Sequence, residues 1–378
     1  MKGFGENNKS KKINRSYFMH KYDENKILND AIKYHCEGNL MQAGKLYKFL
    51  VEKGSKNSNV YTNYGLILIS KGKLKEAEYL IRKAIEFNPK DSIAYSNLGG
   101  LLKNQKNLKE AEKSLLKAIE LNPKDSIAYS NLGSVLKDLS KLEEAEKSLL
   151  KAIELNPKDS IAYSNLGSVL KDLSKLEEAE KSLLKAIELN PKDSIAYSMM
   201  GGILKDLSKL EEAEKSLLKA IQLNPKDSIA HSNLGSVLKD LGKLEESEKS
   251  LLKAIEINPN FASAYFLLST LRASTKDKDW QKYLFSPRIL NNQKDINLID
   301  IYFARANILE KNLKYTESAN MLIKANMLNR KVYNSDYIRM KKKMKYYSNI
   351  WRNLKSKDEF QENQPTSIFI VGLPRSGK

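Results

Sequence analysis

The sequence has few of the residues that build covalent cross-links or metal sites. Cys36 is its only cysteine, which excludes an intramolecular disulfide framework and any zinc site made of several cysteines. The histidines are scattered at His20, His35 and His231, so we expect no metal cluster. We interpret His35 and Cys36 as ordinary helix residues, because adjacent positions rarely share one face of a helix.

Long apolar runs are also absent. No stretch approaches the ~18 to 20 apolar residues that cross a bilayer. The basic residues 1–18 contain no apolar signal-peptide core. We therefore assign residues 1–23 to a basic N-terminal tail, and we predict a cytoplasmic protein with no membrane contact.

The net charge of +19 is concentrated at the two ends of the chain. Residues 262–378 carry 22 Lys and Arg against 10 Asp and Glu, whereas residues 58–261 are nearly neutral. Basic ends can attract an anionic partner such as nucleic acid, or they can serve solubility alone. We favour a solvated helix face for the run KKKMK at 341–345.

What the sequence does contain is a period of 34 residues. Prolines recur at this spacing, at positions 89, 123, 157, 191, 225 and 259, and residues 126–159 recur unchanged at 160–193. A fixed period of this length indicates stacked supersecondary units.

Each unit contains two apolar stripes with helical spacing, which predict a hairpin of two amphipathic helices. In one unit the first stripe is formed by Tyr129, Leu132, Gly133 and Leu136, and the second by Ala145, Leu149, Ala152 and Ile153.

The ends of the predicted helices carry local signals. Asp125 or Ser126 can cap the first helix, because a short side-chain oxygen accepts from the first-turn amides. Ser140 marks the turn between the helices, and Pro157 ends the second helix. The position equivalent to Ser140 is glycine in three other units, at Gly38, Gly72 and Gly242, which predicts a left-handed backbone there.

Small residues are expected where helices cross closely. Gly133 and Ala145 leave room between the two helices of a unit, and Ala152 leaves room for the next unit. We predict that Gly133→Leu costs a few kcal/mol by overpacking.

These residues resemble the tetratricopeptide repeat (TPR) family. Its pattern of aromatic, Leu-Gly, Ala, apolar, Ala and Pro is met by Tyr129, Leu132, Gly133, Ala145, Leu149, Ala152 and Pro157. We assign six regular repeats to 58–261 and a degenerate one to 24–57, so the array covers 24–261. Residues 262–360 are expected to be a degenerate helical region with another copy at 301–330. The resemblance implies an all-α, right-handed superhelical solenoid whose first helices line the concave side.

On that side the first helices carry a ladder of amides. Its members are Asn63, Asn97, Asn131, Asn165 and Asn233, interrupted by Met199. Because an amide both donates and accepts hydrogen bonds, such a ladder can bind a peptide backbone without reading its sequence. Charged pairs, among them Lys137 with Asp138 and Lys171 with Asp172, could select polar segments. The alternative is that these positions are solvated helix surface.

The chain closes with IFIVGLPRSGK, at 368–378. We assign 361–378 to a linker and the start of a phosphate-binding strand and loop, in which Gly372 and Gly377 bracket the turn. As Gly-x-x-x-x-Gly-Lys the loop matches a nucleotide-triphosphatase motif without the following Ser or Thr. As Pro-Arg-Ser-Gly it resembles the loop with which sulfotransferases bind the activated sulfate donor PAPS, the interpretation that we favour. The remaining alternative is an apolar tail with no site.

The order of repeats and loop resembles bacterial proteins in which TPRs precede a tyrosylprotein-sulfotransferase-like domain. The resemblance implies donor contacts for Arg375, Ser376 and Gly377, although Lys378 stands where threonine is expected. The leading hypothesis is a non-catalytic scaffold that binds extended peptides and needs no cofactor. The alternative is the substrate-binding part of a truncated or split PAPS-dependent sulfotransferase, and nucleic-acid binding ranks third. The partner and the oligomeric state stay open.

Overall fold

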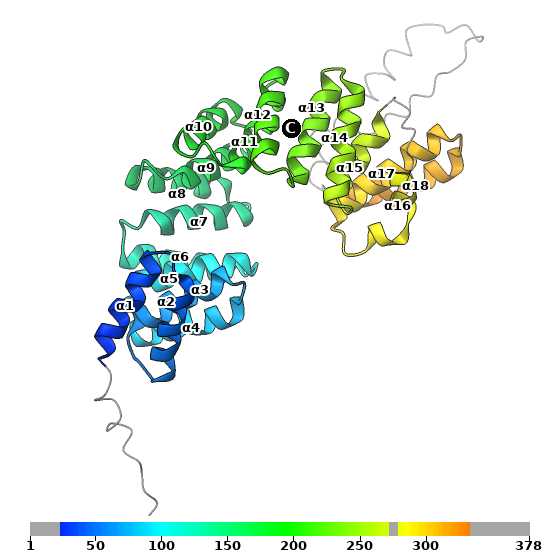
Figure 1. Ribbon diagram of the computed structural model, residues 1–378. Helices are drawn as coiled ribbons and strands as arrows, with labels where there is room; N and C mark the ends of the chain where they lie inside the picture. The colour runs from blue at the N-terminus through cyan, green and yellow to red at the C-terminus, as the bar shows by residue number, and fades with distance from the viewer. Residues whose placement is uncertain (1–22, 272–278, 333–378) are drawn as a thin grey trace, which may run out of the picture. The chain divides into compact units, whose positions relative to one another are not determined.

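The computed structural model describes residues 23–271 and 279–332, and the chain divides into two units, 1–169 and 170–378. The described residues are helical and contain no strand (Figure 1). The helices of the first unit are α1 (Glu24–Cys36), α2 (Leu40–Glu52), α3 (Ser58–Ser70), α4 (Leu74–Phe87), α5 (Ser92–Asn104), α6 (Leu108–Leu121), α7 (Ser126–Asp138) and α8 (Leu142–Leu155). Helix α9 (Ser160–Asp172) spans the division between the units.

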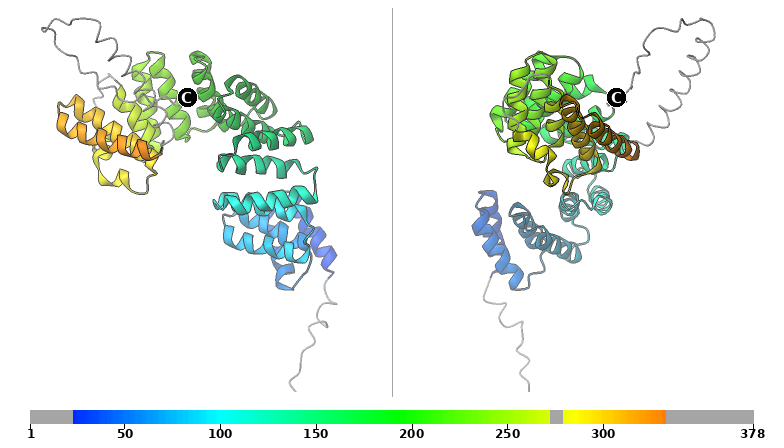
Figure 2. Two further views of the ribbon diagram at one scale, coloured as in Figure 1. Left: turned by 180° about the vertical axis from the view of Figure 1, so that it is seen from behind. Right: turned by 90° about the vertical axis from the view of Figure 1, so that its right-hand side faces the viewer.

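The second unit continues with further hairpins. Its helices are α10 (Leu176–Leu189), α11 (Ser194–Asp206), α12 (Leu210–Leu223), α13 (Ser228–Asp240), α14 (Leu244–Ile257), α15 (Ala262–Thr270), α16 (Asp279–Phe285), the 3-10 helix η2 (Pro287–Leu290), α17 (Asp295–Lys311) and α18 (Tyr315–Val332). Within each unit the helices follow one another in chain order (Figure 2). The predicted all-α stack of helical hairpins is confirmed, whereas the predicted C-terminal strand and loop lie outside the described residues.

The first helices of consecutive hairpins contact one another. In the first unit α3 contacts α5 and α5 contacts α7, and in the second unit α11 contacts α13. Within the described part of either unit, consecutive second helices approach one another less closely. We call the surface formed by the first helices of a unit its inner surface.

The helix ends follow the local signals in the sequence. Asp125 is the N-cap of α7, because its carboxylate accepts from the backbone amides of Ile127 and Ala128, each at 3.0 Å. Ser126 is the first helical residue. Helix α8 ends at Leu155, just before Pro157, which cannot continue a helix.

The turns inside the hairpins have left-handed backbone. Gly38, Gly72 and Gly242 have φ of +76°, +73° and +76°, as predicted. The same turn position holds a side chain in other repeats, with φ of +61° at Ser140 and +64° at Lys106. Since the left-handed region costs a non-glycine residue roughly 1 to 2 kcal/mol, these turns carry backbone strain.

Glycine makes close packing possible inside each hairpin. A Cβ added at Gly133 would lie 2.5 Å from Cγ of Leu149, which is closer than carbon atoms pack. The structure therefore places Gly133 in a tight helix contact, as predicted, and its partner on the second helix is Leu149. Ala145 and Ala152 are fully buried in the same hairpin.

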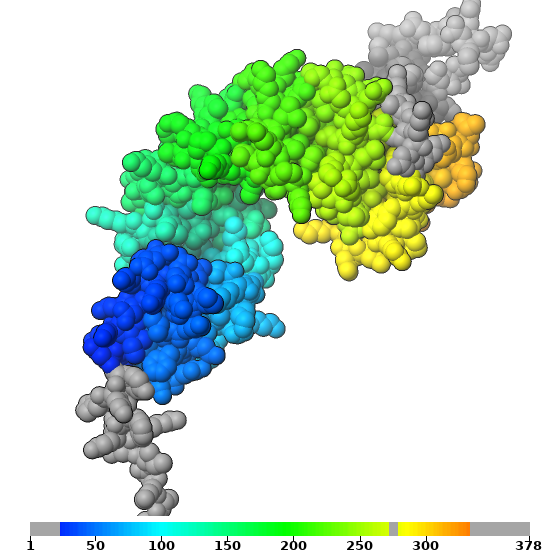
Figure 3. All heavy atoms as spheres, in the orientation of Figure 1, coloured from blue at the N-terminus to red at the C-terminus, as the bar shows by residue number. Residues whose placement is uncertain are grey.

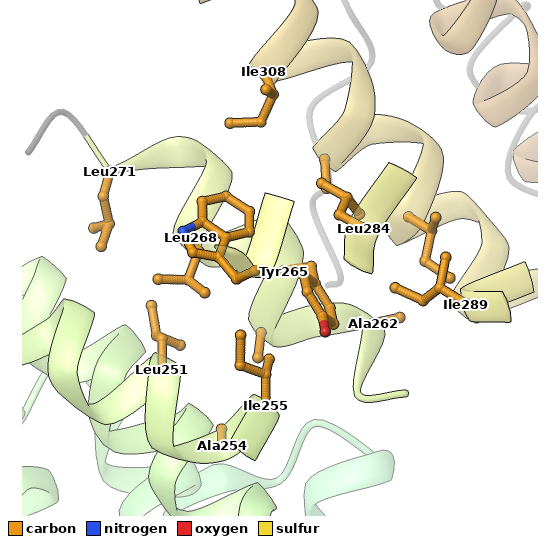
Figure 4. Close-up of a cluster of buried hydrophobic side chains, with 14 residues drawn as sticks. Leu251, Ala254, Ile255, Ala262, Tyr265, Leu268, Leu271, Leu284, Ile289 and Ile308 are labelled. Atoms are coloured by element: carbon orange, nitrogen blue, oxygen red, sulfur yellow. The ribbon is translucent and has the colours of Figure 1, made fainter. Parts of the chain in front are cut away.

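The hairpin pattern changes after α14. In a regular repeat the first helix packs against the helix that follows it. Helix α15 packs instead against α17, which takes the place of that second helix. The atoms of α16 and α17, in yellow, lie directly against those of α15 in Figure 3. Apolar side chains of α14, α15, α16, η2 and α17 point toward one another and form a shared core around Tyr265 (Figure 4).

Helices α17 and α18 form a hairpin with the repeat's own pairing. Oγ of Ser318 donates to the carbonyl of Ala306 at 3.0 Å, twelve residues away. In the hairpin of α13 and α14, Ser247 donates to the carbonyl of Gly235 over the same spacing. These two helices span the degenerate copy expected at 301–330, and its assignment as a repeat stays a prediction.

Candidate functional site

The predicted asparagine ladder lies on the first helices. Each asparagine is the sixth residue of its helix and is half-buried, as is Met199 at the equivalent position of α11. In the first unit the ladder runs through α3, α5, α7 and α9, with one asparagine on each: Asn63, Asn97, Asn131 and Asn165. In the second unit the ladder position holds Met199 on α11 and Asn233 on α13.

The amides of the first unit face neighbouring helices. A Cβ added at Gly100 of α5 would lie 3.8 Å from Nδ2 of Asn131 on α7, so this amide reaches toward the preceding first helix. Burial raises the pKa of the Tyr47 phenol on α2, and the side chain of Asn63 opposes this rise. Nδ2 of Asn97 is buried and has no hydrogen-bond partner within the described residues. A buried donor without a partner is costly to the fold.

Lysines connect successive first helices across the inner surface. In the first unit Nζ of Lys103 donates to Oγ of Ser134, and Nζ of Lys137 donates to Oγ of Ser168. In the second unit Nζ of Lys239 donates to Oγ1 of Thr270 at 3.0 Å. Each lysine thus spans from one first helix to the next.

The aspartates of these charged pairs also face the preceding helix. In the second unit Lys171 lies 3.5 Å from Asp206, and Lys205 lies 3.5 Å from Asp240. Asp138 and Asp172 are exposed at the ends of α7 and α9. The charges that the sequence offers to a ligand are therefore already engaged in part between repeats.

Lys103 lies partly buried on α5. Burial lowers its pKa, the carboxylate of Asp138 opposes that shift, and the ammonium of Lys137 adds to it. The cationic form of Lys103 is consequently less stable than that of a lysine in water.

Sequence reasoning missed the serines that receive these lysines. The role of Ser134, Ser168 and Thr270 as acceptors depends on how far one hairpin is displaced from the next. The repeat itself held the signal, because Lys and Ser recur 31 residues apart in these contacts.

Salt bridges occupy the second helices. Nζ of Lys141 lies 2.6 Å from Glu112 of the preceding repeat, and Lys209 and Lys243 pair in the same way with Glu180 and Glu214, each at 2.8 Å. These lysines stand in the turn of one hairpin and their partners on the second helix of the hairpin before it. Each of these turns is therefore joined by charge to the second helix of the hairpin before it.

The described residues contain no group of three or more His, Cys, Asp or Glu side chains that could hold a metal ion. Across 23–271 and 279–332, the helices are too short or too polar to cross a membrane. The residues predicted to contact PAPS, Arg375, Ser376 and Gly377, lie outside the described part of the chain.

Family models agree with the geometry of the hairpins. Models described as tetratricopeptide repeat match residues 68–136, 126–159, 160–193 and 228–261, and one described as TPR repeat matches 201–242. The chain is a tetratricopeptide repeat protein. The models that match this TPR protein describe its repeat alone, and the sulfotransferase resemblance finds no support among them.

Some solved structures have a similar fold. The APC/C hetero-tetramer Cut9–Hcn1 is 18% identical over 64% of this chain and 48% of that one, with a TM-score of 0.59. A tetratricopeptide repeat protein of Parabacteroides merdae is 20% identical over 65% and 97%, with a TM-score of 0.51. At these identities the likeness shows the fold alone.

A third solved structure is YrrB, which is described as a TPR protein with an unusual peptide-binding site. It is 30% identical to this chain over 47% of this chain and 92% of its own, with a TM-score of 0.40. The comparison with curated proteins finds no match.

Proposed function

We propose that this TPR protein is a non-catalytic scaffold that binds extended peptide segments of other proteins along its inner surface. The observation that carries the proposal is the ladder of half-buried asparagines, one on each first helix from α3 to α9.

The spacing of the ladder suits a peptide backbone. Packed helices lie ~8 to 10 Å apart, and an extended chain advances ~3.3 Å per residue. One amide would then meet about every third residue of the peptide. Because each amide can donate and accept at the same time, it pairs with a backbone amide and carbonyl whatever the side chains are.

The lysines beside the ladder add a preference for polar peptides. Lys103 and Lys137 hold their ammonium groups on serine hydroxyls at the inner surface. A ligand with acceptor groups can share these donors, whereas an apolar ligand would bury them without compensation. The binding of polar segments is therefore favoured.

Peptide capture tests the proposal on the full chain. We expect the triple variant Asn97→Ala, Asn131→Ala, Asn165→Ala to lose most of its affinity for a library of extended polar peptides. Each lost backbone hydrogen bond is worth roughly 0.5 to 1.5 kcal/mol, so three should weaken binding by about one to three orders of magnitude. The measurement is binding to immobilised peptides, read as a dissociation constant.

A matched control uses three lysines of the second helices, Lys83→Ala, Lys117→Ala and Lys151→Ala. Each pairs only with a glutamate three residues along its own helix in the contacts described. The control variant should bind as the parent does. Equal affinity of the asparagine variant and the parent, with both folded by circular dichroism, contradicts the proposal.

The sulfotransferase alternative depends on the loop sequence at 368–378 and on its position after the repeats. It stays a prediction that no matched family supports. Calorimetry with PAPS on the full chain checks it, because the loop predicts contacts through Arg375 and Ser376. We expect no binding from this chain by itself.

A further inference from the structure

Each first helix from α5 to α13 carries an exposed isoleucine as its second residue. In the first unit these are Ile93 on α5, Ile127 on α7 and Ile161 on α9, which are 60%, 63% and 65% exposed. In the second unit Ile195 on α11 and Ile229 on α13 hold the same place. A single exposed apolar residue is common on proteins, whereas a register of them on consecutive first helices forms a continuous feature. We call the three isoleucines of the first unit the isoleucine row.

The isoleucines are not needed to form the helices. Helix α3 has Asn59 in the same place, and α15 has Ser263. The backbone amide of Asn59 donates to a side-chain oxygen two residues before it at 3.0 Å, and the amide of Ile127 does the same at the same distance. The helix start is therefore equally well capped with a polar side chain, and the isoleucines present an apolar surface that the fold does not bury.

The isoleucine row lies beside the asparagine ladder. On α7, Ile127, Asn131 and Ser134 follow one another at i, i+4 and i+7, so they share one face of the helix. Asp138 continues this face at i+11 and is exposed. Because an α-helix rises ~1.5 Å per residue, the isoleucine stands ~6 Å from the asparagine along the helix axis, and the aspartate stands ~10 Å away on the other side. The inner surface thus has an apolar edge and a charged edge, with the amides between them.

The spacing of the row selects a peptide conformation. Packed first helices repeat at ~8 to 10 Å. A polyproline II helix has about 3 residues per turn and rises ~3.1 Å per residue, so its residues i, i+3 and i+6 point the same way at intervals of about 9 Å. In a β-strand the residues on one face are only ~6.8 Å apart, and residues i and i+3 point to opposite faces. A strand therefore does not match consecutive isoleucines, whereas polyproline II does.

We infer that the inner surface of the first unit binds a peptide in the polyproline II conformation with an apolar side chain at every third position. The inference rests on the function proposed above and names the class of ligand. The apolar side chains pack on Ile93, Ile127 and Ile161. Because polyproline II makes no internal hydrogen bonds, its carbonyls are open to the amides of the ladder. The other two positions of each triplet face the charged edge or solvent, and they are polar.

Binding of synthetic peptides to the full chain tests the inference. The periodic peptide consists of four Leu-Pro-Ser units, since a residue before proline favours the β and polyproline II regions. Its control has the same composition with the leucines at irregular spacing. We expect the chain to bind the periodic peptide at least about tenfold more tightly, because only this peptide covers all three isoleucines of the row. Fluorescence anisotropy of the labelled peptides gives the two dissociation constants.

Two variants separate the row from apolar surface in general. Ile93→Ser, Ile127→Ser and Ile161→Ser together should lower the affinity for the periodic peptide to that for the control peptide. The matched control, Leu116→Ser with Leu150→Ser, removes leucines of the second helices that are 51% and 50% exposed. This control should keep the tenfold preference of the parent. Circular dichroism verifies that both variants are folded.

The outcomes distinguish the inference from the function on which it rests. Equal affinity of the parent for the two peptides overturns the inference, and the scaffold proposal still stands if the asparagine variant loses both. A preference that survives the isoleucine substitutions also overturns it. Tighter binding of a peptide with leucine at every second residue means that a strand is bound, which overturns it as well. Binding of none of these peptides overturns the inference, and capture of the polar library then decides the scaffold proposal by itself.

Discussion

Two adjacent glycines of α5 provide a sharp test of packing inside the hairpins. A Cβ added at Gly99 would lie 2.4 Å from Cγ of Leu115, whereas one added at Gly100 would meet only Nδ2 of Asn131, at 3.8 Å. Replacing either glycine by alanine raises helix propensity by about 1 kcal/mol. Only Gly99→Ala adds overpacking, which costs about 1 to 3 kcal/mol.

The two variants should therefore move in opposite directions. We expect Gly100→Ala to stabilise the array by about 1 kcal/mol, and Gly99→Ala to destabilise it by up to about 2 kcal/mol. Since the helix and the substitution are the same, the propensity terms cancel, and the difference between the variants measures the overpacking.

Urea denaturation of the full chain, followed by circular dichroism, reports this difference as a shift in midpoint. Because stacked repeats can unfold in parts, hydrogen exchange of α5 and α6 should accompany the denaturation curves. Combining Gly99→Ala with Leu115→Ala should cost less than the sum of the two single substitutions, because the clash is relieved while the buried leucine side chain is lost in either case. Equal stability of the two glycine variants would refute the role assigned to Gly99.

Other predictions follow from the same contacts. Ser140→Gly should stabilise by about 1 kcal/mol in thermal unfolding, because it removes left-handed strain. Gly133→Leu should cost a few kcal/mol by the same measurement, and an unchanged melting temperature would contradict it. Burial raises the pKa of Glu248, so its protonated form is favoured in the fold, and this site gains stability as the pH falls through that pKa. Glu248→Gln should accordingly raise the melting temperature at neutral pH and lose its advantage in acid, whereas Glu214→Gln, which breaks the pair with Lys243, should lower it.

Features set by neighbours in the sequence could be predicted from the sequence. The cap at Asp125, the left-handed turn at Gly72 and the small residue at Gly133 each depend on a few adjacent residues or on one hairpin. These signals were clear because the cap, the turn residue and the small residue recur at the same positions of several repeats.

Contacts between hairpins could not be predicted in the same way. The bond from Lys103 to Ser134 requires the displacement between two first helices, which no local pattern specifies. The candidate site shows the same difference. The positions of the ladder asparagines followed from helical spacing, whereas the side chains of adjacent hairpins that lie beside them could not be predicted.

The packing of the region after α14 could not be predicted for another reason. Ser269 stands where regular repeats have glycine. Its hydroxyl donates to the carbonyl of Phe266 and accepts from the side-chain amide of Asn307 on α17. That partner is 38 residues away and outside the period. Packing of α15 on α17 therefore depends on contacts between residues far apart in the sequence, and it replaces the hairpin of two consecutive helices.

The lysine contacts of the inner surface make the array adjustable in length. Lys103 presents to Ser134 the same chemistry that Lys137 presents to Ser168. Residues 126–159 and 160–193 are identical, so removing 126–159 would place Ser168 opposite Lys103, where Ser134 now lies. Gain or loss of a whole repeat thus creates no new junction, and the reach of the protein can change by single steps without redesign of its core.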